Sequence, residues 1–568
     1  MTTELLGIIL IFALSVLLAW PLGGYIARVF GGQRTWMDFF APLENFIYRL
    51  AGIDPRQPMD WKQNLRALLV LNLVFFLWAI LALMFQDWFF WNPAGKEGWE
   101  PTLAFNTAVS FTTNTNLQHY SGEVSASYFT QLLVFCYLQF VTAATGIAAC
   151  ALLFKGLAQR EAKDIGNFYD LFLKSNTRIL LPLSLVLALI LMFSGTPASF
   201  EGPQTVTTLE GQTIEVAGGP VAPMVAIKQM GTNGGGYFGP NSTHPFENPN
   251  YLTNIAENVA ILLIPMALVF AFGFYLKRRK LAVTFFAVMS VLFVVFVAVS
   301  AQQEMNGTPE LHALGLAADQ PNMEGKEVRF GPAASSLWGV STTSTSNGSV
   351  NSMHDSHTPL SGGVFLLDMF INAIYGGVGV GFINFFMFVI IAVFIAGLMV
   401  GRTPELLGKK IESREVKIAA LVVLLHPFLI LVGTALASYS IRQDPSLGWL
   451  NNPAFHGFSE MLYEFTSAAA NNGSGFEGLG DNTPFWNVLT GLWMGLGRFI
   501  PIIGPLAIAG SLASKRYIPE SAGTLRLDTS AFGVVLLSVI LIVAALAFFP
   551  ALVLGPLAEH FTIRIGGM

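Results

Sequence analysis

The chain has 568 residues, of which 53 % are apolar and only 11 % are charged. A soluble domain carries about 25 % charged residues, so this composition excludes a set of ordinary soluble domains and indicates a chain solvated mainly by lipid. The formal net charge of −5 gives no reason to expect a nucleic-acid partner, and two cysteines exclude a disulfide framework.

Apolar runs recur along the whole chain, and a membrane-spanning helix needs about 20 such residues. Ten runs meet this length, at 5–28, 66–90, 127–154, 178–196, 256–276, 281–302, 364–400, 417–440, 484–512 and 530–556. The seventh run is too long for one straight helix. It contains the glycines Gly376, Gly377, Gly379 and Gly381, so we expect the helix to break there.

The connections between these runs alternate in character. One set is short and basic and comprises 29–65, 155–177, 277–280, 401–416 and 513–529. The other set is long, acidic and rich in Gly, Asn, Ser and Thr, and comprises 91–126, 197–255, 303–363 and 441–483. The positive-inside rule places the basic set in the cytoplasm and both termini outside. The acidic outer face either concentrates cations or is only the complement of that rule.

Each long connection contains a related polar phrase, and the phrases follow one another at near-equal spacing. They are Thr113-Asn114-Thr115-Asn116, Gly231-Thr232-Asn233-Gly234, Thr345-Ser346-Asn347-Gly348 and Ala470-Asn471-Asn472-Gly473. Each phrase lies between two spans on the same side, which predicts a helix, a re-entrant pore loop and a helix, repeated four times. The predicted fold is an all-α polytopic membrane protein with ten transmembrane helices, a pseudo-fourfold axis and one extra helix at each end.

The predicted segments follow from these units. They are an N-terminal helix and loop at 1–63, repeats at 64–165, 166–279, 280–414 and 415–525, and a C-terminal helix at 526–568.

The four phrases carry a specific chemistry if they line a pore. Irregular backbone at membrane depth is tolerated where it lines a cavity, and rings of backbone carbonyls replace the hydration shell of a monovalent cation. Short helices that end at such loops direct the negative ends of their dipoles at the ion. The phrases contain no carboxylate, which disfavours a divalent ion. The alternative is that they are ordinary Asn-Gly turns, but their fourfold recurrence favours the pore.

A family resemblance rests on a combination of motifs across the whole chain. The motifs are 104–111 with 113–116, Gly-Thr-Asn-Gly-Gly-Gly (231–236), His-Pro-Phe-Glu-Asn-Pro (244–249), Met-His-Asp-Ser (353–356), Gly-Gly-Val-Gly (376–379) and Gly-Arg-Phe (497–499). The chain resembles the potassium-binding A subunit of the bacterial Kdp potassium-transporting ATPase, the KdpA family within the superfamily of K⁺ transporters. One departure is Asn347, where relatives carry Cys before the third filter glycine.

The resemblance implies a function and a set of partners. The expected function is selection of external K⁺ in the four-loop filter, with transfer of the ion through an intersubunit tunnel to the B subunit, which is a P-type ATPase. The expected complex also contains a single-span C subunit and a small single-span F subunit in the bacterial cytoplasmic (inner) membrane. K⁺ is the expected cargo at the filter residues, and no organic cofactor is expected in this chain.

Several residues near the phrases have a functional and a structural interpretation. Arg498 lies inside the ninth span. The resemblance implies a place below the filter, where Arg498 either blocks channel-like flow or helps to strip and direct the ion. The structural alternative is an Arg paired with an acid or with carbonyls. The glycines 376, 377, 379 and 381 form a gate or permit close helix packing. Gln118 shapes the filter by hydrogen bonding or is an ordinary loop residue. Asp368 is expected to be a solvated charge at a helix end.

The sequence offers no site for ATP hydrolysis. None of its Gly-Lys pairs is followed by Ser or Thr, and it has no Asp-Lys-Thr-Gly-Thr phosphorylation phrase and no HExxH. No cytoplasmic connection is long enough for a nucleotide-binding domain. The expected role is therefore that of a non-catalytic component of a K⁺-transporting ATPase complex. The alternative is a stand-alone K⁺ channel or an ion-gradient-driven K⁺ symporter of the same fold.

Overall fold

The structure is a computed structural model that describes residues 2–309, 320–519 and 526–565. Within these residues, ten helical segments are long and apolar enough to cross a membrane, which confirms the ten predicted spans. They are α1 (Thr2–Phe30), α3 (Trp61–Met84), the π-helical η3 (Thr130–Cys136) with α6 (Tyr137–Ala158), α7 (Phe168–Lys174) with η4 (Ser175–Leu180) and α8 (Leu181–Phe193), α10 (Tyr251–Tyr275), α11 (Arg279–Asn306), α15 (Val380–Met399), α16 (Ser413–Gln443), α18 (Pro484–Ser514), and α19 (Ser530–Leu552) with η8 (Val553–Leu557) and α20 (Ala558–Ile565).

Four shorter helices precede the four polar phrases. They are α4 (Pro101–Thr112), α9 (Val221–Met230), α13 (Gly331–Ser344) and α17 (Ala454–Ala470). A proline at the start of α4 and α13 suits the first turn of a helix, where the missing N–H has no partner to lose. We call these four the pore helices.

The remaining elements are short, and all except the helix at Pro359–Ile371, which belongs to the seventh apolar run, lie in the connections. They are η1 (Trp36–Phe40), α2 (Ala41–Ala51), η2 (Gln86–Trp88), α5 (Gly122–Ser125), η5 (Asn241–Thr243), η6 (His354–Ser356), α14 (Pro359–Ile371) and η7 (Pro445–Leu447). Two antiparallel hairpins complete the fold. They are β1 (Gln204–Thr207) with β2 (Thr213–Val216), and β3 (Glu405–Leu406) with β4 (Lys409–Lys410).

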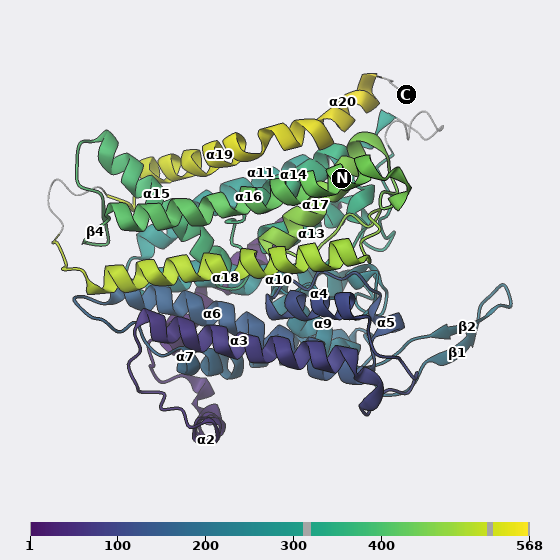
Figure 1. The fold of residues 1–568 in the computed structure, drawn as a ribbon, viewed down its shortest axis with the longest axis horizontal. Coiled ribbons are helices and arrows are strands. Elements are labelled where there is room, and N and C mark those ends of the chain that lie inside the picture. The colour runs from purple at the N-terminus through teal and green to yellow at the C-terminus, as the bar shows by residue number, and fades with distance from the viewer. Residues whose placement is uncertain (1, 310–319, 520–525, 566–568) are drawn as a thin grey trace.

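The long helices run roughly alongside one another, and the connections gather at two ends (Figure 1). The β1–β2 hairpin, α5 and α20 lie at the right-hand end of that view, and β4 lies at the left-hand end. Both chain termini are at the end with the β1–β2 hairpin, which is also the end of the long acidic connections. This arrangement agrees with the predicted alternation, while the side of the membrane that each end faces stays a prediction.

The seventh apolar run is interrupted, as its glycines predict. The helix α14 ends at Ile371, and α15 begins only at Val380. Asn372 closes α14 in a left-handed conformation (φ +45°), and Gly379 precedes α15 with φ +85°. Asn and Gly are the residues that tolerate this region best, so the chain can leave one helix and enter the next inside the protein. We call residues 372–379 the span-seven loop.

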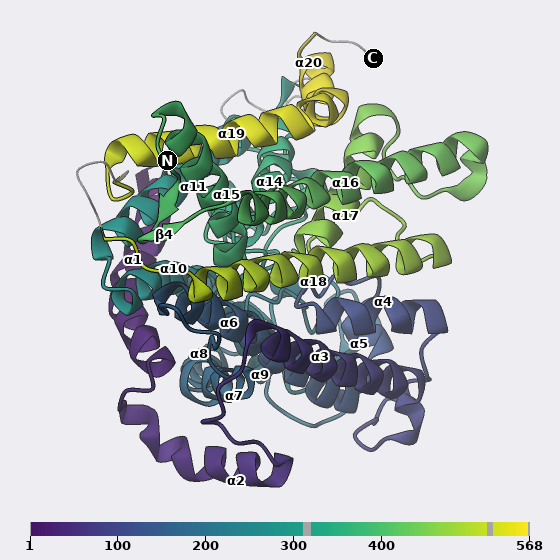
Figure 2. The same cartoon turned by 60° about the vertical axis from the view of Figure 1, so that its left-hand side comes forward.

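Each pore helix packs between the spans of its own repeat, and the two end helices lie outside these units (Figure 2). The pore helix α13 contacts α11 and α14, and α17 contacts α16 and α18. At the N-terminus, α1 packs along α10, where a Cβ at Gly23 would lie 2.7 Å from the carbonyl oxygen of Ala267. Small residues permit such close helix approach in membranes. The expected fold class, four helix–pore loop–helix units with an extra helix at each end, is confirmed.

Candidate functional site

All four pore helices end with the same backbone motif. In each, the second residue of the polar phrase is left-handed, with φ of 61° at Asn114, 43° at Thr232, 48° at Ser346 and 53° at Asn471. The next amide N–H then donates to the carbonyl five residues earlier at 2.9 Å. These bonds are Thr115 to Ser110, Asn233 to Lys228, Asn347 to Thr342, and Asn472 to Ser467. This is the hydrogen bond of the Schellman cap, so four different sequences adopt one geometry.

The last residue of each phrase is left-handed as well. The φ values are 56° at Asn116, 81° at Gly234, 92° at Gly348 and 107° at Gly473. Left-handed residues thus occupy the second and fourth positions of every phrase, and the third position lies outside that region. This alternation departs from helical backbone, which leaves the carbonyls of the phrase free to turn away from the helix axis.

The four phrases form a closed ring. A Cβ at Gly234 would collide with the carbonyl oxygen of Asn347, one at Gly348 with that of Asn472, and one at Gly473 with that of Thr115. The amide of Asn116 closes the circuit by donating to the carbonyl of Asn233 at 2.8 Å. Each phrase therefore lies against the third-position carbonyl of the next, and glycine is required where two backbones meet.

Side chains of the phrases support the ring from outside. The Asn114 amide donates to the carbonyls of Gly231 and Thr232, and the Asn472 amide donates to the carbonyl of Thr342 at 2.8 Å. Asn347 donates in the same way to Lys228 at 3.2 Å, and its Oδ1 accepts from the Ser349 amide. The side chain of Asn347 is thus engaged in the scaffold.

All sixteen residues of the four phrases lie in this ring. The fully buried polar residues among them are Thr113, Thr115, Thr232, Asn233, Thr345, Asn347 and Asn472. Two polar residues of the first phrase contact each other, because the hydroxyls of Thr113 and Thr115 lie 2.7 Å apart. Gln118 connects the chain just beyond two phrases: its Nε2 donates to the Gly236 carbonyl at 3.1 Å, and its Oε1 accepts from the Gly236 amide at 2.8 Å.

The span-seven loop lies directly against the second and third phrases. The Val378 amide donates to the hydroxyl of Thr232 at 3.0 Å, and the hydroxyl of Ser346 donates to Oδ1 of Asn372 at 3.2 Å. A Cβ at Gly377 would lie 3.4 Å from that of Ser346. The loop therefore covers the ring on the side where the pore helices end.

The glycines of the span-seven loop are also packed against backbone. Gly376 and Gly381 face each other so closely that a Cβ on either would collide with the other's Cα. A Cβ at Gly379 would collide with the carbonyl of Gly146 on α6, and the Gly376 amide donates to the Ser344 carbonyl at 2.9 Å. Close packing and loop formation occur together here, so both predicted interpretations of these glycines have a structural basis.

Arg498 lies beside this loop. It is 5 % exposed, and its Nη2 is buried without a hydrogen-bond partner among the described residues. A Cβ at Gly146 would lie 3.0 Å from this nitrogen and would also collide with the Val378 carbonyl, so Arg498 reaches α6 close to the loop. Within residues 2–309, 320–519 and 526–565, no carboxylate lies within ion-pair distance of Arg498, which argues against the alternative of a structural pair with an acid.

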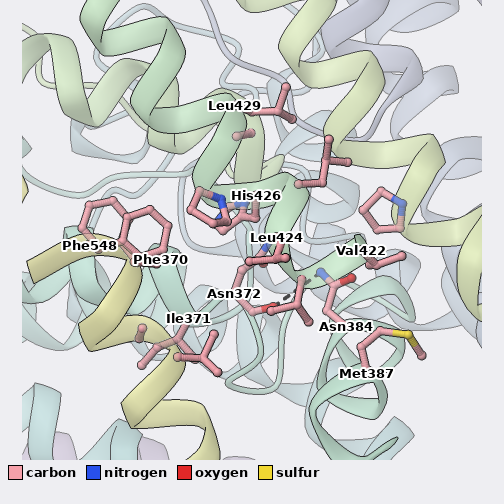
Figure 3. Close-up of a pocket in the computed structure, with 18 of the residues that line it drawn as sticks. Phe370, Ile371, Asn372, Asn384, Met387, Val422, Leu424, His426, Leu429 and Phe548 are labelled. Carbon is pink, nitrogen blue, oxygen red and sulfur yellow. Dashed lines mark hydrogen bonds between the residues drawn. The ribbon is translucent and has the colours of Figure 1, made fainter. Parts of the chain in front are cut away.

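A cavity of about 290 Å³ opens next to the ring and the loop (Figure 3). Its lining includes Asn372, Asn384, His426, Met387 and Phe548. Asn372 joins this cavity to the ring, because its amide lies 3.5 Å from the Ala470 carbonyl, and Asn384 donates to the Asn372 carbonyl at 3.4 Å. The walls are otherwise mainly apolar.

The prediction for Asp368 is wrong. The residue is fully buried on α14, and its Oδ2 accepts from the hydroxyls of Thr343 at 2.8 Å and Ser344 at 2.6 Å, at the end of the pore helix α13. A charge at a helix end is usually solvated, but here the helix ends inside the protein at the span-seven loop. No local sequence signal distinguishes these two environments.

Sequence reasoning also missed a buried ion pair behind the second phrase. Lys228 is fully buried in α9 and pairs with Glu247, which is buried too. Its ammonium also donates to Oδ1 of Asn241 at 2.8 Å, and the Asn241 amide donates to the Gly234 carbonyl at 2.5 Å. A lysine inside an otherwise apolar pore helix is the signal that could have identified it.

His119 joins the first and fourth repeats at the end with the long connections. Its Nδ1 lies 2.7 Å from Oδ1 of Asn487, and its Nε2 lies 3.0 Å from Oε1 of Glu464. Burial lowers the pKa of His119, but Asp481 and Glu464 outweigh this and raise it to about 9. Because both ring nitrogens face oxygen acceptors, the imidazole is held as a cation.

Comparisons with known proteins agree on one family. The family model described as "Potassium-transporting ATPase A subunit" matches residues 9–561. A potassium-transporting ATPase potassium-binding subunit from Flavobacterium psychrophilum is 57 % identical, over 99 % of this chain and all of that protein. A protein of the same name from Alicyclobacillus acidocaldarius is 51 % identical, over 98 % of this chain and 99 % of its own length.

Among solved structures, the potassium transporter TrkH from Vibrio parahaemolyticus has a similar fold. The TM-score is 0.53 at 14 % identity, and the match covers 89 % of this chain and 98 % of that one. At this identity the likeness concerns the fold alone. The sequence comparisons are more informative than the structural one. The family match and these identities show that the chain belongs to the family of potassium-transporting ATPase A subunits.

Proposed function

We propose that this chain binds K⁺ in the ring formed by its four phrases and passes the ion on for ATP-driven import. The observation that carries the proposal is the closed circuit of backbone carbonyls at Thr115, Asn233, Asn347 and Asn472. Carbonyl rings of this kind substitute for the hydration shell of a monovalent cation. The relatives' name, potassium-binding subunit, supports K⁺ as the ion.

The surroundings of the ring favour a cation as well. Four helices end at the ring, and the carbonyl end of a helix carries roughly −0.5 elementary charge. The phrases supply no carboxylate that would attract divalent ions more strongly. Asn347 keeps its carbonyl in the ring because its side chain bonds to the scaffold, so the Cys-to-Asn departure from relatives leaves the selectivity intact.

We also propose that the span-seven loop and Arg498 stop unregulated flow below the ring. The loop contacts three of the four phrases, and Arg498 adds a buried positive group beside it. A cation that leaves the ring on this side meets that charge in a low-dielectric setting, where repulsion is strong. Such a barrier suits a protein whose cargo moves only when a partner hydrolyses ATP.

The proposed partners are those of the Kdp complex: a P-type ATPase as the B subunit, a single-span C subunit and a small single-span F subunit. The proposed location is the bacterial cytoplasmic membrane, with both termini outside. A stand-alone channel or ion-gradient symporter is the second candidate, and the fold shared with the TrkH transporter is the observation that favours it.

The test is K⁺-dependent ATP hydrolysis by the complex purified through a tag on this chain. Gly234→Asp introduces a side chain where a Cβ already collides with Asn347, and we expect it to require far higher K⁺ for half-maximal stimulation. Gly218→Asp is the matched control, because a Cβ at Gly218 meets nothing within 4 Å. Unchanged K⁺ dependence in Gly234→Asp would contradict the ring as the binding site.

The same purification decides between a pump subunit and a stand-alone channel or symporter. If no ATPase accompanies the tagged chain and the chain alone carries K⁺ across liposomes, the channel or symporter function replaces the role in a pump. The ring could still be the ion site in that case, and Gly234→Asp in the same liposomes would show whether it is.

A further inference from the structure

A second group of polar residues lies away from the ring, where the loop after the third phrase meets the start of α17. Asp355, in η6, and Glu460, on α17, are both buried, and Asn452 lies between them. The Asn452 amide donates to Oε1 of Glu460 at 3.0 Å and lies 3.3 Å from Oδ2 of Asp355. Two carboxylates thus share one neutral donor.

His456 is next to this group, but it contacts carboxylate oxygens other than the two that Asn452 contacts. His456 directs Nε2 to Oδ1 of Asp355 at 2.9 Å and Nδ1 to Glu559 of α20 at 2.8 Å. Both ring nitrogens thus face carboxylate oxygens, an arrangement that favours the imidazole with a proton on each nitrogen. Because both nitrogens carry protons, His456 is a counter-charge and has no lone pair for a metal.

Glu460 has no such counter-charge within hydrogen-bond distance. Its residue is fully buried, and Oε2 has no hydrogen-bond partner among the described residues. A buried carboxylate with an unpartnered oxygen is costly, so this oxygen indicates a missing partner.

The Gly478 backbone packs tightly against this pair. A Cβ at Gly478 would lie 2.5 Å from Oε1 of Glu460 and 2.7 Å from Oδ2 of Asp355, so only glycine fits here. The absence of a side chain lets the two carboxylates, which come from different repeats, lie close to each other. Asn452 is half-buried and Glu477 is exposed, and Oε2 of Glu477 accepts from the Asp355 amide at 3.1 Å, so the group borders solvent on one side.

We propose that Asp355, Glu460 and Asn452 form a binding site for one calcium-class divalent cation, separate from the four-phrase ring. All three supply oxygen ligands, which hard divalent cations prefer, and a set of irregular geometry suits Ca²⁺ better than Mg²⁺. Asn452 becomes a ligand when its side-chain carboxamide flips, so that Oδ1 takes the place of Nδ2. The flip leaves the shape of the side chain unaltered. The bound ion replaces the shared amide as the partner of both carboxylates.

The site would connect the loop that follows the third phrase to the pore helix of the fourth. Asp355 follows Gly348 by seven residues, and Glu460 lies on α17, the helix that ends at Ala470. A cation held by both would fix these segments relative to each other. It acts on the scaffold around the ring, and its existence does not depend on the ion that the ring binds.

The test is calcium binding to the full chain in its purified complex after chelator treatment, by titration calorimetry with CaCl₂ and then MgCl₂. We expect one Ca²⁺ per chain, with affinity in the roughly millimolar range of extracellular calcium modules or tighter, and weaker Mg²⁺ binding. We expect Glu460→Gln to weaken Ca²⁺ binding at least tenfold. Glu215→Gln, in the exposed β2 strand, is the matched control and should bind as the wild type does.

Thermal unfolding separates loss of the site from loss of the fold. In chelator, we expect Glu460→Gln to unfold no earlier than the wild type, because it removes a buried charge, while Ca²⁺ stabilises only the wild type. Asn452→Asp adds a carboxylate and should bind Ca²⁺ more tightly. Absence of wild-type Ca²⁺ binding, equal binding by Glu460→Gln, or stabilisation by protons alone would each overturn the proposal.

Discussion

The first and fourth phrases reach the same backbone geometry as the second and third by a different route. Asn114 and Asn471 hold the left-handed position in one pair, and Thr232 and Ser346 hold it in the other. Asparagine tolerates this region, whereas a β-branched threonine there is a genuine outlier that costs about 1–3 kcal/mol. The span-seven loop forms hydrogen bonds with three phrases, at the Thr232 hydroxyl, the Ser346 hydroxyl and the Ala470 carbonyl.

This difference shows how one ring combines two kinds of support. The first and fourth repeats are joined at the end with the long connections by His119 with Glu464 and by Asn106, whose amide donates to the Asn487 carbonyl at 2.9 Å. The second and third rely on the span-seven loop and on the buried pair of Lys228 and Glu247. The half of the ring with the less favourable residues therefore forms two of these three hydrogen bonds to the loop.

The largest expected effect is removal of the buried cation behind the second phrase. Lys228→Met leaves Glu247 buried without its partner, and breaking a buried pair from one side costs about 3–5 kcal/mol. We expect a large drop in the thermal unfolding midpoint of the complex. The double variant Lys228→Met with Glu247→Gln should recover much of it. If Lys228→Met alone is as stable as the wild type, the Lys228–Glu247 pair does not stabilise the half of the ring formed by the second and third phrases.

The half of the ring formed by the first and fourth phrases is expected to lose stability at alkaline pH. The folded pKa of His119, about 9, lies above the ordinary value of 6.5, so its stabilisation is complete below about pH 6.5 and is lost as pH rises through about 9. The loss is at most about 3 kcal/mol. His119→Gln should unfold earlier at pH 7 but show a flatter decline between pH 7 and 10. Parallel pH profiles for the two proteins would exclude this role.

A smaller effect is expected at the contact between the second phrase and the loop. Thr232→Val keeps the side-chain shape but removes the oxygen that accepts from the Val378 amide, and an unsatisfied buried donor costs about 1–3 kcal/mol. Hydrogen exchange in peptides that cover 372–379 should accelerate by at least about fivefold, while Thr232→Ser stays near the wild type. Equal hydrogen exchange in Thr232→Val and Thr232→Ser would show that this hydrogen bond does not couple the span-seven loop to the ring.

The smallest effect is expected at Asn347, the third residue of the third phrase. Asn347→Cys loses the amide bond to the Lys228 carbonyl, worth about 0.5–1.5 kcal/mol, but keeps the backbone carbonyl in the ring. Stability should fall slightly and the preference for K⁺ over Na⁺ should not change. A large change in preference would show that the side chain, and not only the carbonyl, faces the ion.

The sequence was sufficient for the features that repeat and insufficient for those that depend on distant pairing. Ten apolar runs and four aligned phrases predicted the spans and the pore loops, because hydropathy and repetition are local properties. Burial of Asp368 against Thr343 and Ser344, and of Lys228 against Glu247, depends on segments that only the fold brings together. The left-handed Thr232 is likewise set by its neighbours, since threonine alone gives no such signal.

The central claim is that the carbonyls of the four phrases bind a monovalent cation. Its most direct test is the anomalous signal of Tl⁺, used in place of K⁺, in crystals of the complex that contains this chain. We expect a Tl⁺ peak enclosed by the carbonyl oxygens of Thr115, Asn233, Asn347 and Asn472, and added K⁺ should displace it. A ring without Tl⁺ in crystals that hold it elsewhere, for instance between Asp355 and Glu460, would contradict the claim.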